Sequence, residues 1–176
     1  MGLALTPAIA QQPQQPGARG PGRPAPPPAI QPKPEEMTKV REKTEQIEAL
    51  VKELKTARAN PDLLGDVEVY SKAGRMLLEF PELFGTQNAI DHSFLVLDQG
   101  IERAKQLQSG QPQWNQGKKQ IHAYYSEIDG SVQPYGVTLP ANYDPAKPTR
   151  LYVWLHGRQN NTTEAEFIYS FQNPRV

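Results

Sequence analysis

Residues 149–167 read TRLYVWLHGRQNNTTEAEF, and this stretch sets the expectation for the fold. Its apolar run, residues 151–155, combines aromatic and branched side chains, which favour a β-strand. A run without polar alternation is typical of a strand that is buried on both faces, as in a parallel sheet. The run stops at residues 156–158, His-Gly-Arg, where a polar loop begins. The sequence therefore predicts a buried strand and then a tight turn at the glycine.

Residues 118–143 predict two further strands ahead of the buried one. Their sequence, KKQIHAYYSEIDGSVQPYGVTLPANY, alternates in hydropathy on both sides of Asp129-Gly130, which is a hairpin signal. We expect His122 on the less buried face of the first strand, and we expect Pro140 to end the second strand. The alternating apolar positions are Ile121, Ala123, Tyr125, Tyr135, Val137 and Leu139. A hairpin followed by a buried strand is thus the expected order.

Three amphipathic helices are predicted further upstream. Apolar residues recur every three or four positions in 35–60, 66–80 and 88–110, which places one apolar stripe on each helix. Proline or glycine closes each helix, with Asn60-Pro61 ending the first. A dimerising coiled coil is the alternative for the first helix, although it lacks three sustained heptads. The stripes comprise Met37, Val40, Thr44, Ile47, Val51 and Leu54; Val67, Tyr70, Leu77 and Phe80; and Ile90, Phe94, Leu97, Ile101, Ala104 and Leu107.

The first 34 residues differ in composition from the rest. Residues 11–34, QQPQQPGARGPGRPAPPPAIQPKP, hold few apolar side chains and many prolines, so we expect a disordered, extended tether. Ahead of it, Ala8-Ile9-Ala10 has the small-x-small pattern of a signal-peptidase site, without the basic region and the full apolar core of an export signal. An export signal shortened at its front, and hence a secreted or periplasmic protein, is the favoured interpretation. An ordinary flexible N-terminus is the alternative.

The overall composition excludes several classes of partner. The 19 basic and 19 acidic residues balance, so no net field attracts nucleic acid or an anionic membrane. No stretch approaches the roughly 18 apolar residues that span a bilayer. Cysteine is absent, which excludes disulfides and thiolate metal sites. We therefore expect no nucleic-acid partner and no membrane span, while the oligomeric state stays open.

Residues 118–171 resemble a known family. The most specific part is 129–158, DGSVQPYGVTLPANYDPAKPTRLYVWLHGR, which looks like the opening of the catalytic domain in large secreted bacterial proteins of the prolyl-oligopeptidase and esterase group. Residues 35–108 are similar to the region that precedes this domain. The resemblance implies an α/β-hydrolase with a Ser-Asp-His triad, an oxyanion hole, and a peptide or ester as substrate.

On this interpretation the fold class is α/β, and the chain holds the first strands of a truncated hydrolase sheet. Residues 1–34 are a signal remnant and tether, 35–112 a helical region, and 113–176 the start of the hydrolase domain.

Gly157, Arg158 and Gln159 are the candidates for the oxyanion hole. Acyl transfer places negative charge on a carbonyl oxygen, and a glycine lets backbone donors approach that oxygen without a Cβ in the way. The N–H groups of Arg158 or Gln159 are the expected donors. Related proteins usually carry a further glycine where Arg158 stands. The alternative is a purely structural turn that leads into a helix, with Thr162 or Thr163 as N-cap and Glu166 completing a capping box.

No catalytic set accompanies this turn. The sequence has no G-x-S-x-G elbow, so no nucleophile is proposed. His92, His122 and His156 fall in different elements without metal-ligand spacing, and we expect neither a metal site nor a cofactor. Glu127 and Asp129 are explained by the hairpin turn.

Three interpretations follow from these observations. The first is an inactive N-terminal fragment of a serine hydrolase. The second is a small non-catalytic interaction module made of helices and a hairpin. The third is a pseudo-enzyme without its triad. A strand as apolar as residues 151–155 needs neighbours on both sides, and the chain offers only a hairpin, so we prefer the first.

Overall fold

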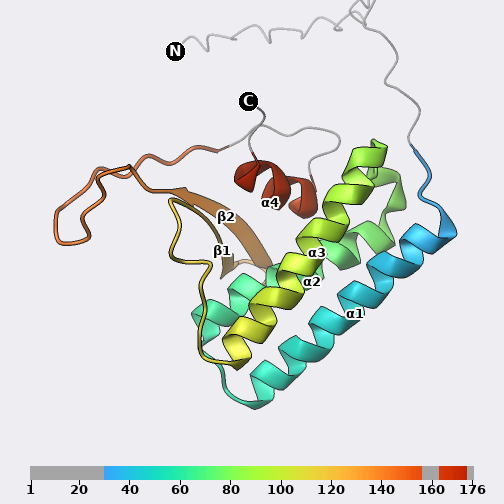
Figure 1. Ribbon diagram of the computed structural model, residues 1–176, viewed down its shortest axis with the longest axis horizontal. Coiled ribbons are helices and arrows are strands. Elements are labelled where there is room, and N and C mark those ends of the chain that lie inside the picture. Colours follow the sequence, from blue (N-terminus) through green and yellow to red (C-terminus); the bar gives the residue numbers. More distant parts are fainter. Residues whose placement is uncertain (1–29, 156–162, 174–176) are drawn as a thin grey trace, which may run out of the picture.

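The computed structural model describes residues 30–155 and 163–173. In Figure 1 the three long helices pack side by side, and the hairpin and α4 lie on the side of this layer away from α1. The described part of the chain thus combines helices with a two-stranded antiparallel sheet, which confirms the mixed fold class in its coarse form. The elements are α1 (Pro34–Thr56), α2 (Pro61–Glu79), the short 3-10 helix η1 (Pro81–Leu83), α3 (Gln87–Gln108), β1 (Lys119–Tyr125), β2 (Val132–Thr138) and α4 (Glu164–Gln172).

The three apolar stripes face one another, as their spacing predicts. Every predicted position of the first stripe from Val40 to Leu54 is buried, and Met37 is partly buried at its start. Phe80 is an exception, because it lies at the C-cap of α2 with 40% of its surface exposed. The second helix also begins earlier than predicted. Asn60 caps α2 by accepting from the N–H of Asp62, and Pro61 starts this helix rather than only stopping the one before.

Two glycines bring the helices unusually close together. A Cβ built on Gly100 of α3 would lie 2.5 Å from Cβ of Tyr70 on α2, and one on Gly74 of α2 would lie 2.1 Å from Oγ1 of Thr44 on α1. Both distances are far below van der Waals contact. Glycine at these two positions therefore sets the spacing of the helical layer, a point that the stripe pattern does not indicate.

The hairpin forms where the alternation predicts it. The strands pair antiparallel, from Lys119 opposite Thr138 to Tyr125 opposite Val132. Gly130 has φ of 69°, in the region that favours glycine, and the carboxylate of Asp129 accepts from both the N–H and the hydroxyl of Ser131. These hydrogen bonds hold the pKa of Asp129 below its ordinary value. Turn chemistry therefore accounts for Asp129, as expected.

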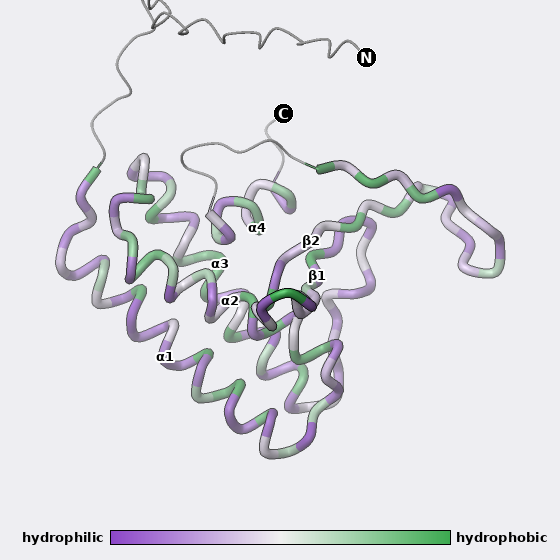
Figure 2. Tube along the Cα trace, turned by 180° about the vertical axis from the view of Figure 1, so that it is seen from behind, coloured by the Kyte–Doolittle hydropathy of each residue, from purple (hydrophilic) through white to green (hydrophobic). Residues whose placement is uncertain are grey.

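Residues 151–155 do not form the predicted buried strand. They are extended away from the helices without strand pairing, and each side chain is between 75% and 90% exposed. Figure 2 shows this largely hydrophobic segment on an arm that leaves the body of the molecule. The composition favours a strand, but a strand needs a neighbour to hydrogen-bond to, and none of the described residues supplies one. The predicted strand is therefore not formed within the described residues.

Helix α4 joins the hairpin to the helical layer. Ile168 is fully buried, and Phe171 lies so close to Gly136 of β2 that a Cβ there would be 2.5 Å from its ring. Ile121 and Val132 of the hairpin and Ala165 of α4 belong to the same hydrophobic core as the three long helices. The helices, the hairpin and α4 therefore share one core.

Candidate functional site

The predicted oxyanion residues lie outside the described part of the chain. Gly157, Arg158 and Gln159, together with His156, belong to residues 156–162, as does Thr162. The structure describes only the two sides of this turn. On one side is the exposed segment 151–155, and on the other is the start of α4 at Thr163.

The helix after the turn begins as predicted. The hydroxyl of Thr163 accepts from the N–H of Glu166 at 3.1 Å, so Thr163 is the N-cap of α4. The expected capping box is only half formed. The Glu166 carboxylate reaches away from the N-cap, and its Oε1 lies 2.9 Å from Nδ1 of His92 on α3.

This contact anchors α4 on the helical layer. The ring of His92 also stacks on Tyr169, with centroids 3.5 Å apart and planes inclined by 14°. A second ion pair joins Lys72 of α2 to Glu164 at 2.8 Å. His92 does not belong to the apolar stripe of its helix, yet α4 covers it, because the two helices are brought together only in the folded chain.

The most developed polar cluster centres on Asp66, which sequence reasoning misses. Asp66 lies on α2 and is only 3% exposed. Its Oδ1 accepts from the backbone N–H of Ala123 on β1 at 2.7 Å. Its Oδ2 accepts from Nε1 of Trp114 at 2.9 Å and lies 2.8 Å from Nδ1 of His122. A buried carboxylate is thus satisfied by partners between 48 and 57 positions away in the chain.

Both ring nitrogens of His122 have polar partners. The amide nitrogen of Gln120 donates to the carbonyls of Asn115 and Gly117 at 2.8 and 2.7 Å, which turns its oxygen toward Nε2 of His122 at 3.0 Å. That oxygen and the carboxylate of Asp66 both only accept. Each ring nitrogen of His122 thus faces an oxygen, and the ring is held between Gln120 and Asp66.

Arg103 is a buried cation beside this cluster. Its Nη1 donates to the carbonyl of Ile121 at 2.8 Å and to that of Asp66 at 3.4 Å. The guanidinium lies between two aromatic rings, 5.0 Å from the centre of Tyr70 and 5.2 Å from that of Trp114. Burial lowers the pKa of Arg103 from its ordinary value.

Tyr70 is the one buried side chain whose polar atom has no hydrogen-bond partner within the described residues. The ring is fully buried, and its hydroxyl finds no acceptor. Burial is the main cause that raises the pKa of Tyr70 to about 12, and the charge of Arg103 opposes that rise. The neutral phenol is therefore favoured in the folded chain.

The cluster around Asp66 holds the hairpin on the helices rather than performing catalysis. A general base needs a free ring nitrogen that faces a substrate, and both nitrogens of His122 are engaged. The two groups that Asp66 and Arg103 bind on β1, the N–H of Ala123 and the C=O of Ile121, are two of those that another strand would use. We name Asp66, Trp114, Gln120, His122 and Arg103 the edge cluster, because it closes the outer edge of β1.

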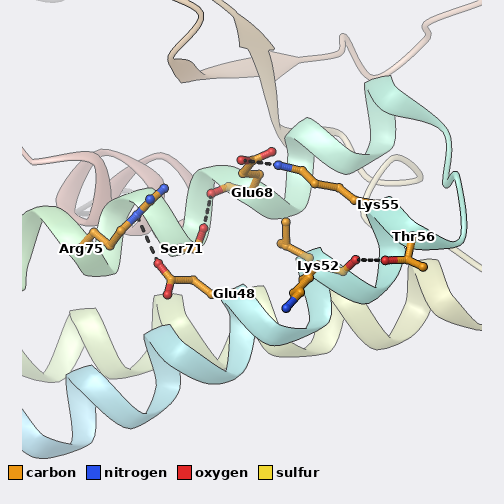
Figure 3. A pocket seen from close by; sticks show the side chains of 8 residues that line it. Glu48, Lys52, Lys55, Thr56, Glu68, Ser71 and Arg75 are labelled. Carbon is orange, nitrogen blue, oxygen red and sulfur yellow. Dashed lines mark hydrogen bonds and ion pairs between the residues drawn. The ribbon is translucent and has the colours of Figure 1, made fainter.

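A shallow groove between α1 and α2 carries many charged side chains, as Figure 3 shows. Its charges are largely neutralised within the groove: Lys55 binds Glu68 at 2.9 Å, and Arg75 lies 3.3 Å from Glu48. Ser71 donates to a backbone carbonyl at 2.9 Å and has no base beside it. The groove therefore presents no activated nucleophile. The other lining residues are Val51, Lys52 and Thr56.

Two further features of the described residues concern metal binding and the membrane. Within residues 30–155 and 163–173, no three His, Cys, Asp or Glu side chains gather where they could hold a metal ion. In the same residues, no helix has the length and apolar character required to cross a membrane.

Comparisons of the chain with protein-family models, with curated proteins and with solved structures found no match. Function is therefore inferred from the residues and their geometry.

Proposed function

We propose that this chain is the N-terminal part of a secreted serine hydrolase of the prolyl-oligopeptidase or esterase type, inactive in isolation. In this proposal residues 151–155 are an inner strand of a larger sheet. The turn that follows supplies backbone donors from Arg158 and Gln159 to the oxyanion, with Gly157 allowing the close approach. The nucleophile, base and orienting acid come from residues beyond the described part of the chain.

One observation carries the proposal. Five consecutive apolar side chains, residues 151–155, are each at least 75% exposed, between a hairpin and a capped helix. Burying such a side chain is worth about 1.5–3 kcal/mol, so an exposed run of this kind marks a surface that another part of a protein covers. The inner strand of a parallel sheet has this composition.

The order of elements supports the same assignment. An antiparallel hairpin precedes the apolar segment, and a helix with a threonine cap follows the predicted turn. The N–H donors of an oxyanion hole would lie at that turn, where a strand passes into a helix. The edge cluster fits this picture, because it closes β1 and leaves β2 as the side on which a sheet can grow.

The decisive experiment begins with the reading frame downstream of Val176. We expect it to continue into a G-x-S-x-G elbow, and we expect the longer protein to react with a fluorophosphonate probe and to hydrolyse p-nitrophenyl esters or prolyl peptides. The 176-residue chain alone is expected to show no turnover above buffer. Turnover by the isolated chain that is abolished by a substitution within it would contradict the proposal, as would a frame that ends without such an elbow.

The role of the turn is tested in the longer protein. Gly157→Val places a branched side chain where the oxyanion should approach, so kcat should fall by about 100-fold or more with a smaller change in KM. The matched control is Gly117→Ala, a glycine far along the chain whose Cβ would meet only backbone at 3.4 Å. Equal activity of the two variants would remove the turn from the mechanism.

The non-catalytic interaction module is the second candidate. The shared core of the helices, the hairpin and α4 favours it, because this core gives the chain a folded body without a larger sheet. It predicts that the frame downstream lacks a hydrolase elbow. Export is proposed on the pattern at residues 8–10, which lie outside the described part, and N-terminal sequencing of the protein recovered from its source tests it.

A further inference from the structure

We propose that the open edge of β2 binds residues 151–155 of a second copy of the chain, so that two copies exchange these segments and form a dimer. The acceptor is the outer edge of β2 around Gly136 and Thr138. The donor is the apolar segment that the structure leaves exposed. This inference does not rest on the proposed function, because it concerns the association of the 176-residue chain.

The register shows which backbone groups of the hairpin point outward. Ser126 donates to the carbonyl of Ser131, and Leu139 donates to that of Lys118, so these pairs are hydrogen-bonded. Hydrogen-bonded and non-hydrogen-bonded pairs alternate along an antiparallel ladder. Four pairs therefore direct their backbone polar groups away from the partner strand, and Pro134 contributes only its C=O. These pairs are Ile121 with Gly136, Ala123 with Pro134, Lys119 with Thr138 and Tyr125 with Val132.

The two outer edges of the hairpin differ in how these groups are satisfied. On β1 the edge cluster binds the outward C=O of Ile121 and the outward N–H of Ala123. On β2 the Nζ of Lys72 binds the C=O of Val132 at 3.0 Å, at the start of the strand. Beyond it, the outward groups of Gly136 and Thr138 have no hydrogen-bond partner among the described residues. β2 is thus the edge that accepts a strand.

The donor is complementary to this edge in its side chains. The face of the hairpin that carries Tyr124 and Tyr135 is open, with these rings 54% and 43% exposed and their centroids 6.2 Å apart. In an added strand, Tyr152 and Trp154 fall on one face and the three aliphatic residues on the other. Placed beside β2, the two aromatic side chains extend the exposed tyrosines into one aromatic surface.

A second copy is the occupant because the chain carries both parts and does not join them itself. Residues 139–150 link β2 to the donor through two turns, closed by Tyr143 N–H to Pro140 C=O and Lys147 N–H to Asp144 C=O. After these turns the segment runs back from the projecting loop without pairing with β2 (Figure 1). Each copy has one donor and one open edge, so a reciprocal exchange satisfies both in a closed pair.

The first test measures mass by sedimentation of the full chain over a range of concentrations. We expect a dimer that dissociates on dilution. Val153→Asp removes the donor by placing a charge in it, and it should raise the dissociation constant at least tenfold. The matched control is Ile128→Asp, which changes a side chain that is 96% exposed in the hairpin turn and should leave the dissociation constant unchanged. A monomer at every concentration overturns the proposal.

The second test separates strand addition from pairing of the donor with itself. Thr138→Pro removes an outward N–H from β2, and this variant should be monomeric. Mixed with the Val153→Asp chain, it should form a heterodimer, because one chain still has a donor and the other an open edge. A Thr138→Pro chain that dimerises like the wild type shows that the segment pairs with itself, which overturns the proposal.

Crosslinking provides a readout that needs no proline. The chain has no cysteine, so single cysteines report proximity cleanly. A Thr138→Cys chain mixed with a Val153→Cys chain should form a disulfide-linked heterodimer on mild oxidation, because neighbouring strands bring these positions together. An Ile128→Cys chain mixed with the same partner should not. Equal crosslinking in both mixtures contradicts strand exchange. The hydrolase proposal is tested by turnover, so either proposal can fail alone.

Discussion

The edge of β1 and residues 151–155 are both extended backbone that no further strand covers in the described part of the chain. At β1 the outward C=O of Ile121 and N–H of Ala123 are bound by Arg103 and Asp66, and the apolar side chain of Ile121 is fully buried. Residues 151–155 have no such partners, and their side chains are at least 75% exposed. The difference shows that extended backbone becomes part of a fold when helices supply both polar caps and an apolar surface.

The first test of this comparison is the stability effect of a substitution at Asp66. Asp66→Ala leaves His122 and the N–H of Ala123 without their acceptor in a buried site, so the free energy of unfolding should fall by about 3–5 kcal/mol. Urea denaturation measures it. Asp98→Ala is the control, because Asp98 pairs with Lys43 on the surface with 55% of its side chain exposed, and it should change stability by about 0.5 kcal/mol or less. Equal losses would show that the edge cluster does not hold the hairpin.

His122 is the next point at which to test the sealed edge. His122→Phe keeps a ring but removes both ring nitrogens, so the oxygen of Gln120 and one oxygen of Asp66 lose a partner. We expect a loss of about 1–3 kcal/mol in the free energy of unfolding. Tyr124→Phe, two positions along the same face of β1, removes only an exposed hydroxyl and should be close to neutral. If His122→Phe leaves the free energy of unfolding unchanged, the imidazole ring contributes nothing to the edge cluster.

Tyr70 tests the same region through the pH dependence of stability, because its ring lies beside Arg103. Its pKa is raised to about 12 from 10.0, mainly by burial, so the folded chain favours the protonated form. This contribution is complete below pH 10 and is lost as pH rises toward about 12. Between pH 10 and about 12, Tyr70→Phe should reduce the loss of stability by about 1.4 kcal/mol or more. At pH 7 the same substitution should leave stability unchanged or increase it, since the hydroxyl has no partner in the described residues.

Denaturation curves at pH 8 to 12 provide the measurement for Tyr70, with Tyr143→Phe as the matched control on a ring that is 44% exposed. If the two variants lose stability equally across this range, burial of Tyr70 does not govern the alkaline transition.

The smallest effect is expected in the exposed segment itself. In the dilute monomer, Val153→Asp should change the free energy of unfolding by about 0.5 kcal/mol or less, because the side chain is 75% exposed. Ile121→Asp, at a fully buried position of β1, should unfold the hairpin or the whole chain.

Amides of residues 151–155 should also exchange far faster than those of 90–107 in α3. Comparable protection of the two segments would show that the sheet extends to residues 151–155.

Local patterns predict much of this molecule and fail where partners are remote. The stripe from Val40 to Leu54 and the turn at Asp129-Gly130 are confirmed, because helix spacing and turn chemistry depend on neighbours in the sequence. Gly157, Arg158 and Gln159 stay a prediction, since they lie outside the described residues. The edge cluster could not be predicted, because an aspartate on an amphipathic helix is expected to be solvent-exposed. Only the strand that packs beside Asp66 in the fold makes it buried.

By itself the sequence determined the three helices, the hairpin and the cap at Thr163, which are set by contacts within a few residues. Only the tertiary structure decided which polar groups are buried and which apolar ones are left open. Asp66 on α2 is buried because α3 and β1 pack against it, with contacting residues that lie 37 and 57 positions further along the chain. Residues 151–155 are exposed because burial requires a surface to pack against, and hydrophobicity alone does not supply one.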